Sequence, residues 1–274
     1  MNTHAFSPKI RISLIPDLRE RHHSWFQAAI AMAALTLVCA ILFSFDDRML
    51  NGVSVWTKPF KFSLSLAVYF ITLAWFAPML AEGYFRTLKG RVLTWLPIGC
   101  AIFEMTYIII QAALGQHSHF NVTTPFHATM YSLMGGGATL LVAVCLWMGA
   151  AILREHGWQD PLVVAAGLGL ILTFVIGGGF GGYLGSQASH WVGGTQSDTG
   201  GMMLVKWSRD GGDLRVAHFF GMHAMQVLPM LAALIPAALT RRTALTLVIV
   251  MTAAYAGLTT WTFIQATTGV PFLG

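Results

Sequence analysis

Charged residues are scarce in this chain of 274 residues: Asp, Glu, Lys and Arg make up 10% of it, whereas 55% is apolar. A soluble domain carries about 25% charged residues, so the composition excludes an ordinary soluble enzyme and indicates an integral membrane protein. The formal net charge of +5 would suggest a nucleic-acid ligand in a soluble protein. Here the basic residues stand between apolar runs, where topology and anionic headgroups explain them. We expect the lipid bilayer, and no nucleic acid, as a partner.

Cysteine is also rare, and the motifs of soluble enzymes are missing. Cys39, Cys100 and Cys145 lie in apolar runs and form no CxxC motif, which argues against disulfides and zinc sites. Because CxxCH is absent, a covalent c-type haem is excluded by that motif. There is no phosphate-binding loop, no GxSxG elbow and no HExxH. The last apolar run has no lysine for a retinal Schiff base, which excludes a rhodopsin-like pigment.

Long apolar runs are abundant. The first, at about 26–45, is roughly 20 residues long, enough for a hydrocarbon core of about 30 Å, and it lacks the cleavage site of a signal peptide. Six further runs follow, at about 62–80, 93–114, 125–152, 161–184, 214–240 and 243–265. The sequence therefore predicts an all-α, polytopic bundle of seven transmembrane helices over residues 26–267, after a polar segment of residues 1–25.

The distribution of Lys and Arg predicts the orientation. If the N-terminus is cytoplasmic, ten of these residues fall on the inner side and six on the outer side. The inner residues are Lys9, Arg11, Arg19, Arg21, Arg86, Lys89, Arg91, Arg154, Arg241 and Arg242. The positive-inside rule then places the N-terminus in the cytoplasm and the C-terminus outside, in the plasma (inner) membrane.

Two outer segments have the composition of structured loops. Asn51-Gly52 predicts a tight turn, and Lys58 and Lys61, next to Trp56, are typical of snorkelling anchors at the membrane interface. Residues 185–212 are rich in Gly, Ser and Thr but contain two tryptophans. This second segment is a candidate lid over the outer mouth of a site.

One face of the third apolar run is polar. Pro97, Cys100, Glu104, Tyr107 and Gln111 follow at spacings of 3, 4, 3 and 4, which puts them on one side of a helix. Glu104 is the only acidic residue deep inside a span, where a carboxylate must be neutralised, paired or hydrated. We therefore predict Glu104 and Tyr107 as catalytic, proton-handling residues. The alternative for Tyr107 and Gln111 is an ordinary hydrogen bond between helices.

The stretch 213–230 carries polar residues at membrane depth. His218 and His223 lie five residues apart, about 140° round a straight helix, so they point in different directions. At about 1.5 Å per residue, His127 and His218 fall within roughly 6 Å of the outer boundary, and Glu104 and His223 reach the middle of the bilayer. This pattern predicts a polar shaft that opens on the outer face.

Haem b is the first candidate occupant of the shaft, with membrane redox chemistry as the function and quinone as a partner. His127 and His218 are the predicted axial ligands, with His223 as a substitute, and Arg215 would pair with a propionate. Glycines at 135–137 and 177–185 would provide the gap for the porphyrin. The alternative is close helix packing, because Gly177/Gly181 and Gly178/Gly182 are GxxxG pairs.

Copper is the second candidate. His117, His119, His127 and His218, with methionines available, form a ligand set without carboxylate, which favours copper over magnesium or calcium. The alternative is that His117 and His119 are polar loop residues without a metal.

Two further functions need no cofactor. Glu104 and His223, with Tyr107, Gln111 and Gln226, would form a proton relay in a proton-coupled carrier of small solutes. A carrier commonly has internal repeats, and this sequence shows none. The remaining interpretation is an accessory subunit whose glycine faces dock other membrane subunits.

Overall fold

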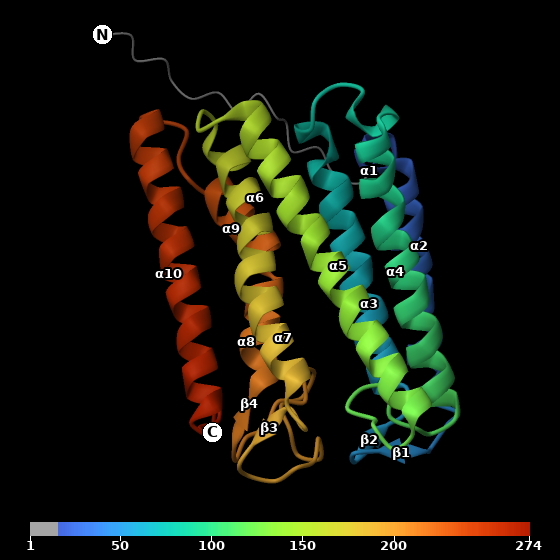
Figure 1. Cartoon of the computed structure of the whole chain (residues 1–274). Helices are drawn as coiled ribbons and strands as arrows, with labels where there is room; N and C mark the ends of the chain where they lie inside the picture. Colours follow the sequence, from blue (N-terminus) through green and yellow to red (C-terminus); the bar gives the residue numbers. More distant parts are fainter. Residues whose placement is uncertain (1–15) are drawn as a thin grey trace.

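The protein is mostly helical, and its long helices run side by side along one axis (Figure 1). The structure, a computed structural model, describes residues 16–274, so Lys9 and Arg11 of the predicted cytoplasmic segment lie outside it. Among the described residues, six helices are long and apolar enough to cross a membrane, or seven if one bent pair counts as a single span. A polytopic helical bundle, as predicted, fits this architecture.

The candidate spans are close to the predicted ones. The first four are α2 (His23–Leu42), α3 (Thr57–Phe76) with η1 (Ala77–Met79), α4 (Leu88–Ala113) and α5 (Pro125–His156). The fifth is α6 (Pro161–Leu172), continued by the π-helix η3 (Thr173–Gly178) and by α7 (Gly179–Ser186). The bent pair α8 (Leu214–Met222) and α9 (Ala224–Ala233) and then α10 (Arg241–Thr267) complete the set. Short helices α1 (Pro16–Arg21) and η2 (Tyr84–Arg86) lie between or before them.

Local sequence signals set several helix starts. The side chain of Thr124 accepts a hydrogen bond from the backbone of His127 at the start of α5, and Asp160 accepts from Leu162 at the start of α6. In both helices the next residue is proline, whose missing N–H costs nothing in the first turn. These caps define where the chain enters each span.

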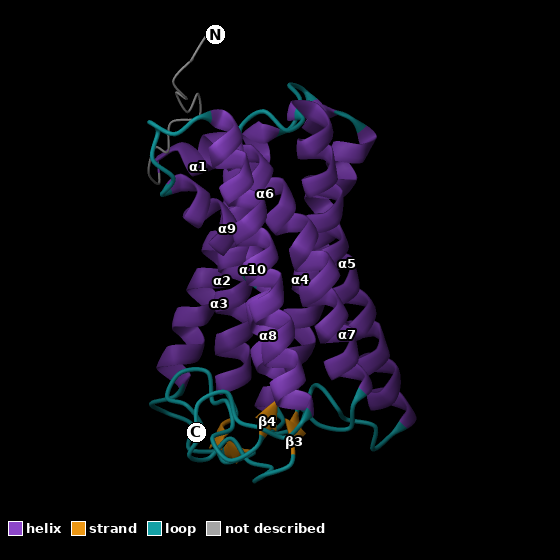
Figure 2. Ribbon diagram, turned by 90° about the vertical axis from the view of Figure 1, so that its left-hand side faces the viewer, coloured by secondary structure: helices purple, strands orange, loops and turns teal. Residues whose placement is uncertain are grey.

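One end of the bundle carries the longer loops, at the bottom of Figures 1 and 2. Strands β1 (Met49–Leu50) and β2 (Val53–Ser54) form an antiparallel hairpin. The predicted Asn51-Gly52 turn is confirmed, with φ of 53° and 77°, as a two-residue hairpin turn requires. Strands β3 (Trp191–Val192) and β4 (Gly212–Asp213) pair in the same way. We call the 187–213 segment the outer loop, after the side of the membrane on which the sequence predicts it to lie.

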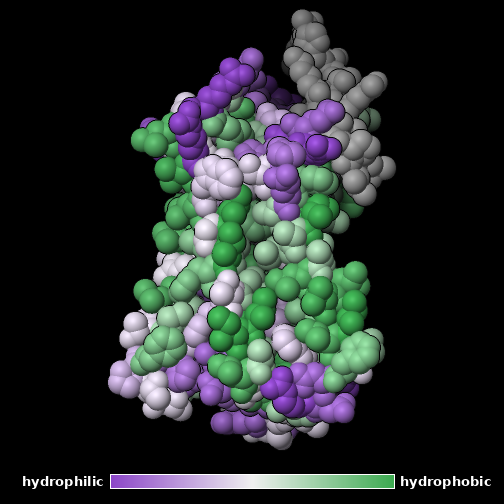
Figure 3. Space-filling view, turned by 90° about the vertical axis from the view of Figure 1, so that its right-hand side faces the viewer, coloured by the Kyte–Doolittle hydropathy of each residue, from purple (hydrophilic) through white to green (hydrophobic). Residues whose placement is uncertain are grey.

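Helix α3 lies at the centre of the bundle, whereas α2 and α10 are peripheral. The main core joins α3 to α4, α5, α6 and α9 through buried side chains such as Phe70, Leu73, Ile108, Met148 and Met225. The face in Figure 3 shows a broad apolar band between two hydrophilic ends. That distribution is expected of a protein that lipid surrounds.

The predicted span over 214–240 is a bent pair of helices rather than one continuous helix. The chain bends by 50° between α8 and α9, and α9 ends at Ala233. The side chain of Thr173 replaces the interrupted helical ladder: its hydroxyl accepts from the backbone of Met225 at 3.1 Å and donates to the carbonyl of Met222 at 3.5 Å. Pro229 has no N–H to bond one turn back, which favours a bend in this region.

Candidate functional site

Glu104 lies inside the bundle, on the buried face of α4. Glu104 is only 4% exposed, and its Oε1 atom is buried without a hydrogen-bond partner among the described residues. Tyr107 and Gln111 of the same face are also buried, and Oε1 of Gln111 likewise has no partner there. Buried polar atoms normally have a hydrogen-bond partner, so these two oxygens of α4 are exceptions within the described residues.

Helix α5 makes room for this carboxyl group at Gly137. A Cβ atom on Gly137 would lie 2.7 Å from Oε1 of Glu104, closer than real contacts allow. By contrast, a Cβ on the adjacent Gly135 or Gly136 would have nothing within 4 Å. One glycine of the predicted triplet therefore accommodates Glu104.

Lys58, which the sequence predicts to be an interface anchor, also interacts with charged groups of three other segments. It is half-buried in the first turn of α3, and its Nζ lies 5.9 Å from the centre of the Phe62 ring. Its charge interacts with Glu104 of α4, Asp198 of the outer loop and Arg215 of α8. Within residues 16–274, Lys58 makes no hydrogen bond or ion pair. The sequence places Lys58 at the start of the second apolar run and Glu104 in the third. Only the fold shows that their charges interact.

Two histidines lie next to this group. His119 is half-buried between the rings of Phe62 and Tyr131, with centroids 5.4 Å and 5.9 Å away. Burial, and then the Lys58 ammonium, lower the pKa of His119 well below its usual value. His127, in the first turn of α5, contacts the Tyr107 hydroxyl through Nδ1 at 3.1 Å. The predicted residues Tyr107 and His127 are therefore in direct contact.

Arg215 is held by two aspartates. It forms ion pairs of 2.9 Å with Asp198 and 2.7 Å with Asp213, and it donates to the carbonyl of Lys206. The ring of His190 lies 3.8 Å from Asp198. Burial would raise the pKa of Asp198, but His190 and Arg215 outweigh it, so this pKa lies below its usual value. Binding of a propionate by Arg215 stays a prediction, and these aspartates would compete with it.

His218 lies against the glycines of the neighbouring span. Its Nδ1 bonds the carbonyl of Gly177 at 2.9 Å, and its ring fills the space where a Cβ of Gly181 would be. Gly177 also touches the backbone of Gly221, so a Cβ there would come within 2.8 Å. The glycines therefore serve close packing and the His218 ring, which is the alternative reading of the GxxxG pairs.

His223 lies at the bend between α8 and α9. The centroid of its ring lies 4.3 Å from that of Phe219, with the two planes tilted by 56°, and the ring interacts with the Gln226 side chain. Gln226 in turn donates to the Thr72 hydroxyl of α3 at 3.0 Å, and its Oε1 is buried without a partner in the described part of the chain. A second group of polar side chains, His223, Gln226 and Thr72, therefore connects the bend to helix α3.

The fit of these residues to a cofactor is mixed. His127 and His218 each use Nδ1 in a hydrogen bond, and Nε2 of neither is bonded within residues 16–274, which suits an axial ligand. However, side chains and backbone occupy the expected glycine gap at Gly137, Gly177 and Gly181. For copper, the described residues contain no group of three or more His, Cys, Asp or Glu side chains able to hold a metal.

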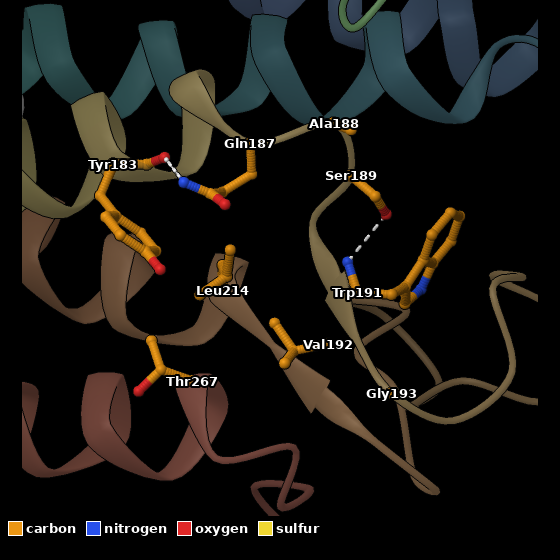
Figure 4. A pocket seen from close by; sticks show the side chains of 9 residues that line it. All are labelled: Tyr183, Gln187, Ala188, Ser189, Trp191, Val192, Gly193, Leu214 and Thr267. Atoms are coloured by element: carbon orange, nitrogen blue, oxygen red, sulfur yellow. Dashed lines mark hydrogen bonds between the residues drawn. The ribbon is translucent and has the colours of Figure 1, made fainter.

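A surface pocket of about 390 Å³ lies elsewhere, between the end of α7, strand β3, the start of α8 and the end of α10. Figure 4 shows the Tyr183 ring and the Leu214 and Val192 side chains around it, with the Gln187 amide donating to the carbonyl of Tyr183. None of the predicted site residues lines it. Its open form and uncharged lining distinguish it from the Glu104 site.

No protein-family model, no curated protein and no solved structure matches this chain. The site's chemistry must therefore be argued from its own residues.

Proposed function

We propose that this chain is a proton-coupled carrier of a small solute in the inner membrane, with seven spans, a cytoplasmic N-terminus and an external C-terminus. Glu104 is the group that takes up and releases the proton, and the outer loop is a lid over the site. The observation that carries the proposal is the Glu104 carboxyl group, buried inside a span with Oε1 unpartnered and a glycine of α5 leaving space for it. Burying a carboxyl group at membrane depth costs free energy, so such a group is by default a candidate functional residue.

The bent span supports the same proposal. Discontinuous helices at mid-membrane depth form the solute and ion sites of many carriers, because their ends expose backbone groups. Here the α8–α9 bend carries His223 and Gln226, and a π-helix faces it across Thr173. π-helical turns are frequent at functional sites. Glu104 and His223 would then be two levels of one proton path.

The test uses the purified full chain in proteoliposomes that contain a pH-sensitive dye. A panel of small organic acids, amino acids and sugars is added outside, and the solute-dependent change of internal pH is recorded. We expect at least one solute to drive proton entry, and Glu104→Gln to abolish it. Glu82→Gln, in an exposed loop at the other end of the bundle, is the matched control. Proton entry that persists in Glu104→Gln, or no solute response in the wild type, contradicts the proposal.

Redox chemistry through haem b is a second candidate, favoured by the Nδ1 bonds of His127 and His218. Haem would supply one-electron transfer, with quinone as the partner. A Soret band in the purified protein that His127→Ala and His218→Ala both remove would establish it. A colourless protein with one copper per chain would instead support the copper site, and a colourless, metal-free protein would reject both.

A further inference from the structure

We infer that Lys58 binds the carboxylate of a small organic acid that also carries a hydroxyl or amino group, next to Glu104 of α4. This inference rests on the proposed function, since the binding site would be next to its proton-binding group. It names the class of solute, which the proton chemistry alone does not.

The first step is the charge around Lys58. The cation that acts on Lys58 is Arg215, and the anions are Asp198 and Glu104; Lys61, one turn further along α3, is acted on by Asp198 and Asp213. Both aspartates are engaged by Arg215, and Nζ of Lys61 donates to the carbonyl of Val205 at 2.8 Å. Of the two anions that act on Lys58, Glu104 is thus the one without an ion pair in the described part of the chain. A half-buried ammonium without a bonded partner attracts an anion strongly.

The second step is that Lys58 and Glu104 do not neutralise each other directly. Their charges interact, yet Glu104 Oε1 has no hydrogen-bond partner among residues 16–274. Gln111, two turns further out on the same face, also presents an unpartnered buried oxygen. Both are acceptors that require a donor. A ligand that satisfies this site therefore needs a negative group for Lys58 and an O–H or N–H group for an oxygen of α4.

The protonation state of Glu104 would couple proton uptake to carboxylate binding at Lys58. When Glu104 is protonated, it no longer offsets the charge of Lys58, so a carboxylate binds more strongly. By linkage, the bound carboxylate favours proton uptake to the same extent. The other groups that face Lys58 are His117 and His119 of the loop before α5, whose pKa values burial and Lys58 lower. They are neutral at pH 7 and leave Glu104 as the switching charge.

Four matched probes test the ligand class on the wild-type protein. Glycolate has both groups, acetate lacks the donor, glycolamide lacks the charge, and glycine replaces the hydroxyl by an ammonium. Binding is measured by calorimetry on the full chain in detergent at pH 5.5 and 7.5. We expect glycolate or glycine to bind about tenfold or more tightly than acetate, no binding of glycolamide, and tighter binding at pH 5.5.

Variants then assign the charge to Lys58. Lys58→Met should abolish glycolate binding, Lys58→Arg should retain part of it, and Lys89→Met, exposed at the other end of α4, should bind as the wild type does. Unchanged binding in folded Lys58→Met, or equal affinity for glycolate and glycolamide, overturns the inference. If Lys58→Met does not fold, the comparison of glycolate with glycolamide decides alone. Proton entry driven only by uncharged solutes would refute this inference while leaving the carrier proposal standing.

Discussion

At the scale of single residues, small side chains decide where polar groups can be buried. Gly137 and Gly181 lie on different spans, yet each leaves space that a polar side chain from a neighbouring helix fills: Glu104 in one case and His218 in the other. A Cβ in either position would displace that group. The same triplet contains Gly135, which is exposed and where an added Cβ would have nothing within 4 Å.

Gly137→Ala tests this role. The new methyl group should displace the Glu104 carboxyl and lower solute-driven proton entry, with a cost in stability of no more than about 1 kcal/mol, because the end of a flexible side chain can move. The free energy of unfolding in denaturant and the vesicle assay measure the two effects. Gly135→Ala is the control, and it should be neutral or slightly stabilising because alanine is the better helix former. Equal effects of the two substitutions would show that Gly137 has no special role.

Arg215 is the residue on which the outer loop depends. Arg215→Met should leave Asp198 and Asp213 buried without a counter-charge, and breaking such a pair costs about 3–5 kcal/mol. We expect the outer loop to become a rapid cleavage site in limited proteolysis. Arg209→Met, exposed in the same loop, should be cut no faster than the wild type. Unchanged protection in Arg215→Met would mean that the hairpin contacts alone hold the loop.

At the scale of elements, the bend between α8 and α9 depends on another span. The hydroxyl of Thr173 bonds both sides of the bend, so the π-helix and the broken helix stabilise each other. The sequence contained a signal in Pro229, but proline alone does not say whether a helix kinks or ends. The hydrogen bonds from Thr173 of η3 determine that the helix bends here.

Thr173→Val should therefore cost about 1–3 kcal/mol, because the shape is kept while the backbone groups of Met222 and Met225 lose their partner. Thr260→Val is the control, since its hydroxyl bonds only the carbonyl one turn back in α10 and is exposed. Denaturant unfolding of both variants gives the comparison. A cost no larger than that of the control would show that the bend is stable without this hydroxyl.

The outer loop should open in acid. The pKa of His190 is lowered, chiefly by burial, from its usual 6.5, and the pKa of Asp198 is also lowered. Both groups favour the folded loop in their less protonated form, so their contribution is complete above pH 6.5. The stabilisation of the folded loop falls first as the pH drops below 6.5 and His190 protonates. It falls further below about pH 4, where Asp198 protonates. Proteolysis with an acid-tolerant protease across pH 7 to 3.5 should show rising cleavage in this loop, and a flat profile would contradict this assignment.

At the scale of the whole molecule, the alternation of spans puts the outer loop and the C-terminus at one end and the N-terminal side at the other (Figure 1). The charge bias predicts which end is outside. Ser197→Cys in the outer loop should react with an impermeant maleimide on intact cells, whereas Glu82→Cys should react only after permeabilisation. The native cysteines are buried or half-buried, which keeps the background low. The reverse labelling pattern would invert the proposed topology.

The sequence by itself determined the helical class and the positions of the spans, because about 20 consecutive apolar residues are a local property of the chain. It also placed Glu104, Tyr107 and Gln111 on one buried face, since helical spacing is local too. Only the tertiary structure decided that the charges of Glu104, Asp198 and Arg215 act on Lys58, and that α8 and α9 are bent. Both depend on side chains from spans far apart in sequence, because the cost of burying a charge or breaking a helix is set by neighbours that no local pattern encodes.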